Sequence, residues 1–162
     1  MSCSSCSHSC GSCHSSCSGC GGHDALTESE RDLLLELAQT PFLPIAQFQR
    51  RESYFAAPEP LDPSPVYLHT GSETTADIEL TSLALRRLAS RGYITLDYDI
   101  PLSGYDYVLY QTSDLQHRLA LLHPGYTILP KRGSMALMLR GQQAADDLEF
   151  FQGAESPSQS LV

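Results

Sequence analysis

Residues 83–99 read LALRRLASRGYITLDYD, and this stretch decides the fold that we expect for the chain. Its first half continues an apolar pattern of helical spacing, which predicts a helix from Thr75 to Arg91. Gly92 stands where a helix commonly ends in a left-handed residue. The residues that we expect this helix to bury are Ile78, Leu83, Leu85 and Leu88.

After Gly92 the pattern changes to strict alternation, which is typical of a half-buried strand. The residues expected on its apolar face are Ile94, Leu96, Tyr98 and Ile100. A turn over 101–104 then predicts that YDYVLYQ (105–111) returns as the hairpin partner. YTILP (126–130) and SMALMLR (134–140) are predicted as a second pair of strands around Lys131-Arg132-Gly133, followed by a helix from Gln142 to Phe151.

The residues before this region predict two further helices and a long loop. Thr27 and Glu30 form a capping box at the start of one helix, which Pro41 ends. PFLPIAQFQRR (41–51) predicts a second, short helix with Pro44 as its first residue. Four prolines between residues 52 and 75 predict a loop. Beyond the first predicted hairpin, Ser113 is expected to cap a helix that continues to Leu122.

This order of elements resembles a winged helix-turn-helix domain. LALRRLASRGYITLDYD is similar to the end of a recognition helix that runs into the first wing strand. GSMALMLRGQQAADDLEFF (133–151) looks like the last wing strand and C-terminal helix of multiple-antibiotic-resistance-type regulators. The resemblance implies an α+β domain over residues 24–152, with a three-helix core, a β-hairpin wing and a C-terminal helix. Residues 52–74 and 113–123 have no place in the simplest version of that fold, and 153–162 are expected to form a disordered tail.

Residues 1–23 differ from the rest of the chain because they hold all six cysteines and no Asp, Glu, Lys or Arg. They consist of a start, MS, and three seven-residue copies, CSSCSHS, CGSCHSS and CSGCGGH. Serine and glycine favour a flexible tail over a helix. The C-x2-C pairs allow two thiolates to reach one ion, and thiolates select soft metals. The candidate ligands are Cys3, Cys6, Cys10, Cys13, Cys17 and Cys20, with His8, His14 and His23 as secondary ligands.

Zinc is the metal that we expect first, with copper(I) or an iron–sulfur cluster as alternatives. The gaps match neither the usual ferredoxin spacing nor the widely separated pairs of zinc fingers. Disulfides, thiol modification and a tail without a ligand remain open alternatives. The chain shows no basic stretch followed by an apolar core at its start, and no apolar run of the ~18–20 residues that cross a bilayer. We therefore expect a cytoplasmic protein without membrane contact.

The winged-helix resemblance implies that the helix over 75–91 enters the DNA major groove and that the wing contacts phosphate. Opposing this, the net charge is −9, and Asp77 and Glu79 occupy the helix half that would read bases. The candidate DNA-binding residues are Arg86, Arg87, Arg91, Lys131, Arg132 and Arg140.

The leading hypothesis is a metal- or redox-responsive regulator that binds double-stranded DNA. The alternative is an adaptor or metal-handling protein whose winged helix binds a protein partner. A homodimer is compatible with either. Phosphate-binding loops, nucleophile elbows and metalloprotease motifs are absent from the sequence, so we do not expect an enzyme.

Overall fold

The computed structural model describes residues 25–154, and the chain before and after them lies outside the described part. The fold is a mixed α+β arrangement built on one antiparallel four-stranded sheet of order β2-β1-β4-β3. The strands are β1 (Phe42–Arg51), β2 (Glu59–Pro60), β3 (Ile94–Asp97) and β4 (Thr127–Leu137). The helices are α1 (Glu28–Gln39), α2 (Thr75–Ser90), α3 (Val108–Gln111), α4 (Asp114–Leu122) and α5 (Leu139–Ala154). The expected α+β class is therefore confirmed.

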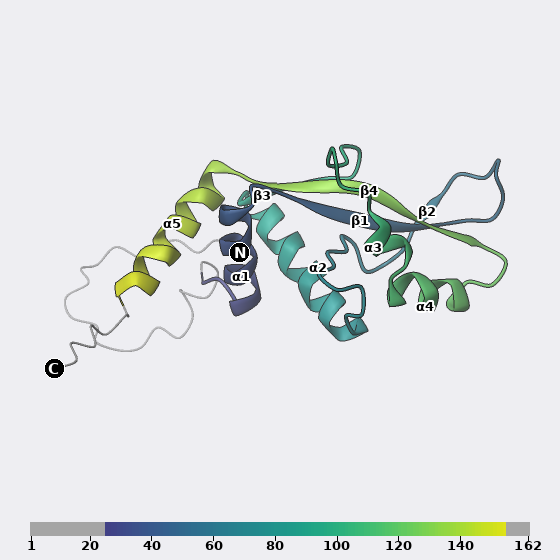
Figure 1. The fold of residues 1–162 in the computed structure, drawn as a ribbon, viewed down its shortest axis with the longest axis horizontal. Coiled ribbons are helices and arrows are strands. Elements are labelled where there is room, and N and C mark those ends of the chain that lie inside the picture. Colours follow the sequence, from purple (N-terminus) through teal and green to yellow (C-terminus); the bar gives the residue numbers. More distant parts are fainter. Residues whose placement is uncertain (1–24, 155–162) are drawn as a thin grey trace, which may run out of the picture.

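A long ribbon of β1 and β4 organises the molecule. The two strands pair without interruption from Phe42–Ala136 to Arg51–Thr127. The buried side of β1 nevertheless changes at the middle of the strand, from Leu43 and Ile45 to Ala46 and Phe48. Two-stranded ribbons twist strongly. Along β1, first one face and then the other can therefore turn toward the helices that cover the ribbon. Figure 1 shows this arrangement, with α1 to α4 on one side of the ribbon and α5 following the C-terminal end of β4.

The ribbon supports two hydrophobic cores, one at each end. The first core joins α1, α2 and α5 to the start of β1, and Leu34, Leu37, Leu85 and Leu88 are its fully buried leucines. The second core joins α3, α4 and the segment 66–68 to the middle of β1 and the start of β4. Ile78, near the start of α2, belongs to this second core, so α2 spans both.

Several predicted elements are confirmed. The capping box of Thr27 and Glu30 is present at the start of α1. The Ser113 hydroxyl caps α4 by accepting a hydrogen bond from the backbone N–H of Gln116. α2 ends as predicted, with Gly92 at a φ of +75°. The Pro-rich segment is mostly loop, although Val66 forms a bridge with Ala46 and residues 59–60 form β2. α5 begins and ends about three residues beyond the predicted helix.

The prediction of a short helix over 41–51 is wrong, because these residues form β1. Phe42, Ile45 and Phe48 are spaced like one face of a helix, but Phe42 is exposed in the strand, and the buried Ile45 and Phe48 lie on opposite sides of it. Pro44 is tolerated because even-numbered residues of β1 direct their backbone groups away from β4, as the bonds between Ala46 and Val66 show. The missing N–H of Pro44 therefore costs no bond to β4.

Both predicted hairpins are also wrong. Residues 108–111 form α3, and β3 pairs with β4 instead, from Ile94–Leu137 to Asp97–Ser134. The segment around Lys131-Arg132-Gly133 is not a turn but the middle of β4. Gly133 is needed for a close approach, since a Cβ there would overlap the Asp97 carbonyl oxygen and lie 3.0 Å from the Cα of Tyr98.

Candidate interaction surface on α2

The outward face of α2 carries two exposed leucines. Leu80 is 55% exposed and Leu83 is 43% exposed, so the prediction that Leu83 is buried is wrong. Ile78, Leu85 and Leu88 are buried as predicted. Leu83 stands two residues before Leu85, which turns it by about 200° to the opposite side of the helix. We define the α2 surface as Glu79, Leu80, Leu83, Arg86 and Arg87.

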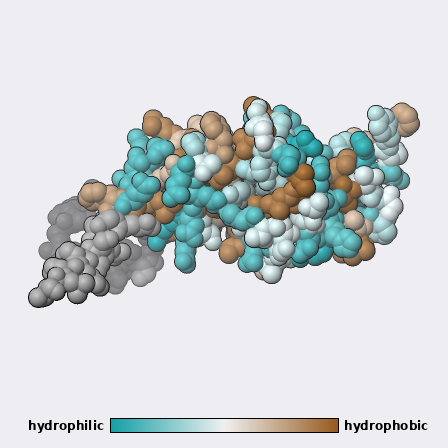
Figure 2. Space-filling view, in the orientation of Figure 1, coloured by the Kyte–Doolittle hydropathy of each residue, from teal (hydrophilic) through white to brown (hydrophobic). Residues whose placement is uncertain are grey.

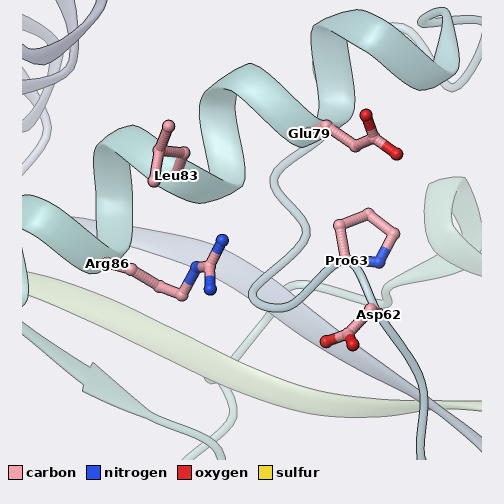
Figure 3. A pocket seen from close by; sticks show the side chains of 5 residues that line it. All are labelled: Asp62, Pro63, Glu79, Leu83 and Arg86. Atoms are coloured by element: carbon pink, nitrogen blue, oxygen red, sulfur yellow. The ribbon is translucent and has the colours of Figure 1, made fainter.

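A hollow of about 430 Å³ lies on one side of Leu83. It is lined by Asp62 and Pro63 from the loop after β2, and by Glu79, Leu83 and Arg86 from α2. Figure 3 shows the Arg86 side chain extending from the helix toward the loop that carries Asp62 and Pro63. These charged groups line one open space without forming an ion pair with each other in the described part of the chain. The hollow can therefore accept charged as well as apolar groups from a ligand.

Side-chain hydrogen bonds hold the loop that lines this hollow. The Gln47 amide nitrogen donates to the Ser64 hydroxyl at 3.2 Å, and this hydroxyl lies 3.2 Å from the Tyr98 hydroxyl. Ser64 directly follows Pro63. The bonds therefore tie the loop with Asp62 and Pro63 to β1 and to the end of β3, which fixes one wall of the hollow.

A second hollow, of about 200 Å³, lies between α2 and the start of α1. Its α2 side is formed by Leu80, Leu83, Ala84 and Arg87, and its α1 side by residues 27–30. Leu80 and Leu83 thus form an apolar ridge. Leu83 borders both hollows and Leu80 borders the second, and Arg86 lines the first hollow while Arg87 lines the second. A ridge of this kind presents apolar area together with a charged anchor, which is common in protein interfaces.

The arginines of α2 differ in their partners. Arg86 and Arg87 are exposed, and no ion pair or side-chain hydrogen bond joins either of them to another residue in the range 25–150. Arg91, by contrast, lies 3.8 Å from the buried Glu30 carboxylate and stacks on the Tyr93 ring. Arg91 therefore joins α2 to α1. The two unpaired arginines stand near the C-terminal end of α2, where the helix dipole favours cations.

The remaining predicted DNA-binding residues divide into two places. Arg140, at the start of α5, stacks on the Tyr93 ring that Arg91 also contacts, so it lies near the end of α2. Lys131 is paired with Asp99 at 2.9 Å, and Arg132 stacks on the Tyr107 ring near the middle of β4. The structure thus brings Arg140 to the end of α2 but places Lys131 and Arg132 along the ribbon.

A polar cluster that the sequence did not reveal lies between α1 and the segment 66–70. Tyr67 donates its hydroxyl hydrogen to Glu36, and the His69 Nε2 atom lies 3.0 Å from the same carboxylate. Burial, followed by the Glu36 contact, raises the pKa of the Tyr67 hydroxyl well above its usual range. His69, which has no visible partner in the sequence, therefore has one in the fold. Because Tyr67 and His69 are two residues apart on an extended segment, both reach the same point of α1.

Glu73 holds the same segment from the other side. Its carboxylate accepts hydrogen bonds from the backbone N–H groups of His69 at 2.6 Å and Thr70 at 2.8 Å. Burial acts to raise the pKa of Glu73, but the backbone donors outweigh burial and lower it below its usual value. Arg118 of α4 donates to the Glu73 carbonyl oxygen at 3.3 Å. This network fixes the loop that leads into α2.

An aromatic tip stands at the end of the molecule farthest from α5. Tyr54 is 82% exposed and Phe55 is 95% exposed in the loop between β1 and β2, and their rings meet edge to face at 5.6 Å. Figure 2 shows hydrophobic surface at the tip where Figure 1 places this loop. Arg51 stacks on Tyr54, and within the described part of the chain both rings remain exposed.

The proposed metal ligands, Cys3 to Cys20 with His8, His14 and His23, lie outside the described residues. Within residues 25–150 no group of three or more His, Cys, Asp or Glu side chains is arranged to hold a metal ion. No helix in the described part is long and apolar enough to cross a membrane. Compared with protein-family models, with curated proteins and with solved structures, the chain matches none.

Proposed function

We propose that this chain is a cytoplasmic metal-handling adaptor, whose α2 surface binds a protein partner while its N-terminal cysteines bind a soft metal. The observation that carries the proposal is the apolar ridge of Leu80 and Leu83 with unpaired Arg86 and Arg87 beside it. An exposed leucine pair flanked by hollows suits a protein side chain better than a phosphate backbone. The acidic residues Asp77 and Glu79 on the first half of the helix would repel phosphate.

The metal part of the proposal rests on the chemistry of the sequence. Three C-x2-C pairs within 18 residues supply six thiols in a segment free of competing charge. Thiolates bind zinc and copper(I) strongly, and zinc is the metal proposed first. A reducing compartment keeps such thiols available for metal, which favours the cytoplasm. Neither the α2 surface nor the cysteine segment is proposed to catalyse a reaction.

A winged-helix origin of the fold belongs to the same proposal. It is supported by the passage from α2 through Gly92 into β3, by the pairing of β3 with β4, and by the passage of β4 into α5. α3 and α4 are inserted between β3 and β4, and a further departure from that fold bears on function. The described residues between β2 and α2 form no helix, so α2 has no preceding helix of the kind that braces a recognition helix against the DNA backbone.

A DNA-binding regulator is the second candidate, and a specific observation favours it. Arg86, Arg87 and Arg140 are exposed and without ion pairs in the described structure, and all three stand near the end of α2. Basic residues grouped in this way could contact phosphate. The candidate then requires α2 to approach the duplex by its C-terminal half, away from Asp77 and Glu79.

Substitution on the α2 surface separates the two candidates. The full chain would carry Arg86→Ala/Arg87→Ala, or Leu80→Ser/Leu83→Ser, with Arg31→Ala on α1 as a matched exposed control. Retention is measured on a pool of random DNA duplexes at low salt. The adaptor predicts no retention that depends on Arg86 and Arg87. Retention that is lost with the arginine pair and kept with the leucine pair would establish the regulator instead.

Metal content tests the other half of the proposal. The full chain, purified without oxygen, is compared with a full-length variant in which all six cysteines are replaced by serine. The proposal predicts about one or two zinc ions per chain in the first protein and none in the second, as expected for four-coordinate thiolate sites. Six free thiols without metal would contradict it. Acid-labile sulfide with a brown colour would indicate an iron–sulfur cluster instead of zinc.

A further inference from the structure

The exposed side of α5 carries acidic residues and a phenylalanine in one stripe. α5 packs on α1 through Ala145 and its neighbours Ala144 and Leu148. Asp146, Asp147 and Phe150 lie on the other side and are exposed, and Phe150 is 75% exposed. No ion pair joins either aspartate to a basic residue within the described range. This stripe is the complement of the α2 surface, which has leucines and unpaired arginines.

The spacing of the two stripes also matches. On α2, the leucines at 80 and 83 precede the arginines at 86 and 87, whereas on α5 the aspartates at 146 and 147 precede the phenylalanine at 150. From Leu83 to the arginines, and from the aspartates to Phe150, the separation is three to four residues, or roughly 4.5–6 Å along the helix. The order is reversed between the helices. An antiparallel arrangement therefore places Phe150 on the leucine ridge and the aspartates beside the arginines.

This match cannot be satisfied within one chain. α1 lies between α5 and α2, and it packs against both. Figure 1 shows α5 running away from the sheet, beyond the helix that separates it from α2. The acidic stripe of α5 therefore points away from the α2 surface of the same molecule.

We infer that the α2 surface binds α5 of a second copy of the chain, so that two chains form a symmetric dimer. A two-fold axis would repeat the contact, with each α5 on the α2 surface of the other chain. The inference rests on the proposed function, since it names the chemistry of the segment that the α2 surface accepts: an acidic helix with one large apolar side chain. An outside partner would bind by presenting a similar helix in place of α5.

Charge reversal tests the inference through the mass of the particle. Sedimentation equilibrium should give the full chain twice the 17.7 kDa mass of one chain. The variant Arg86→Glu/Arg87→Glu places like charges together in both contacts, and so does Asp146→Arg/Asp147→Arg. Each variant alone should raise the dissociation constant by about tenfold or more, because two pairs are reversed in each of two contacts. All four substituted residues are exposed, so both variants should keep the circular dichroism spectrum of the parent.

Mixing the two variants gives the sharpest result. In a mixed pair, the glutamates on α2 of one chain face the arginines on α5 of the other, and the second contact keeps the native residues. The mixture should therefore restore the dimer that each variant alone has lost. A reversal of Asp32 and Arg31 on α1 is the matched control and should leave the mass unchanged.

Three outcomes would overturn the inference: a full chain that stays at 17.7 kDa, dimers that survive both reversals, or a mixture that does not reassociate. The dimer and the proposed adaptor function can fail independently of each other. If the chain is a monomer and a photo-crosslinking residue in place of Leu83 still forms an adduct with another protein, the dimer is refuted and the adaptor remains. If the chain is a dimer and position 83 forms adducts only with the second copy, the inference is supported and an outside partner is refuted.

Discussion

Tyr110 is the side chain whose hydroxyl we expect to hold the Pro-rich segment against the sheet. It is fully buried, and its hydroxyl donates to the Pro44 carbonyl oxygen at 3.0 Å while it accepts from the Leu68 N–H at 3.3 Å. The first bond reaches β1 and the second reaches the segment 66–68, which continues into the loop before α2. The substitution Tyr110→Phe removes both bonds and keeps the ring.

The expected cost follows from the groups left behind. The Leu68 N–H is buried, and an unpaired buried donor costs ~1–3 kcal/mol. The Pro44 carbonyl is partly buried and adds about 1 kcal/mol at most. We therefore expect Tyr110→Phe to lower the free energy of unfolding by about 1–4 kcal/mol, which corresponds to a Tm lower by roughly 3–16 °C for a domain of this size.

Urea unfolding followed by circular dichroism measures this change, since the chain has no tryptophan. Tyr105→Phe is the matched control, because Tyr105 stacks on Tyr107 but its hydroxyl makes no hydrogen bond in the described structure. The control should change the free energy of unfolding by less than ~0.5 kcal/mol. If Tyr110→Phe proved as mild as Tyr105→Phe, the hydroxyl would contribute nothing beyond the other bonds between this segment and β1, such as those between Ala46 and Val66.

Three further substitutions test other parts of the fold. Because the pKa of Glu73 is lowered, its carboxylate stabilises the fold above its ordinary pKa of 4.5 and loses that effect as the pH falls, so Glu73→Gln should flatten the acid limb of stability in pH-dependent urea titrations. Burial raises the pKa of both Tyr67 and Tyr110 above the ordinary 10.0, so stability should fall as the pH rises past 10, and less steeply in a variant with phenylalanine at both positions. Gly133→Ala should cost ~1–3 kcal/mol in thermal unfolding, because its Cβ would overlap the Asp97 carbonyl oxygen; an unchanged Tm would refute the close packing of β3 on β4.

The helices with clear ends are the elements that the sequence predicts well. Thr27, Ser113 and Gly92 act through local hydrogen bonds or backbone conformation, so their effect is readable without knowing what lies next to them. The strands are harder to predict from the sequence, because their burial depends on distant parts of the chain. β1 reads as a helix because its buried side changes at Ala46, and that change depends on the twist of a ribbon whose other strand is some 85 residues away.

Gly133 is another residue whose role depends on a distant part of the chain. In the sequence it stands after Lys131-Arg132 and indicates a turn, whereas in the fold it makes room for the backbone of Asp97. The α2 surface was only half predictable. Arg86 and Arg87 could be identified from the sequence, but the hollows beside them require Asp62, Pro63 and the start of α1, which come from distant parts of the chain.

The central claim is that the α2 surface binds protein, and a photo-crosslinking residue at position 83 tests it most directly. The full chain, expressed in the cells that make it, would carry this residue in place of Leu83, with the same residue in place of the exposed Thr95 of β3 as the control. The account predicts protein adducts at position 83 that are absent at position 95 and are lost when Arg86→Ala/Arg87→Ala is added. DNA adducts at position 83, or protein adducts that are equal at both positions, would contradict it.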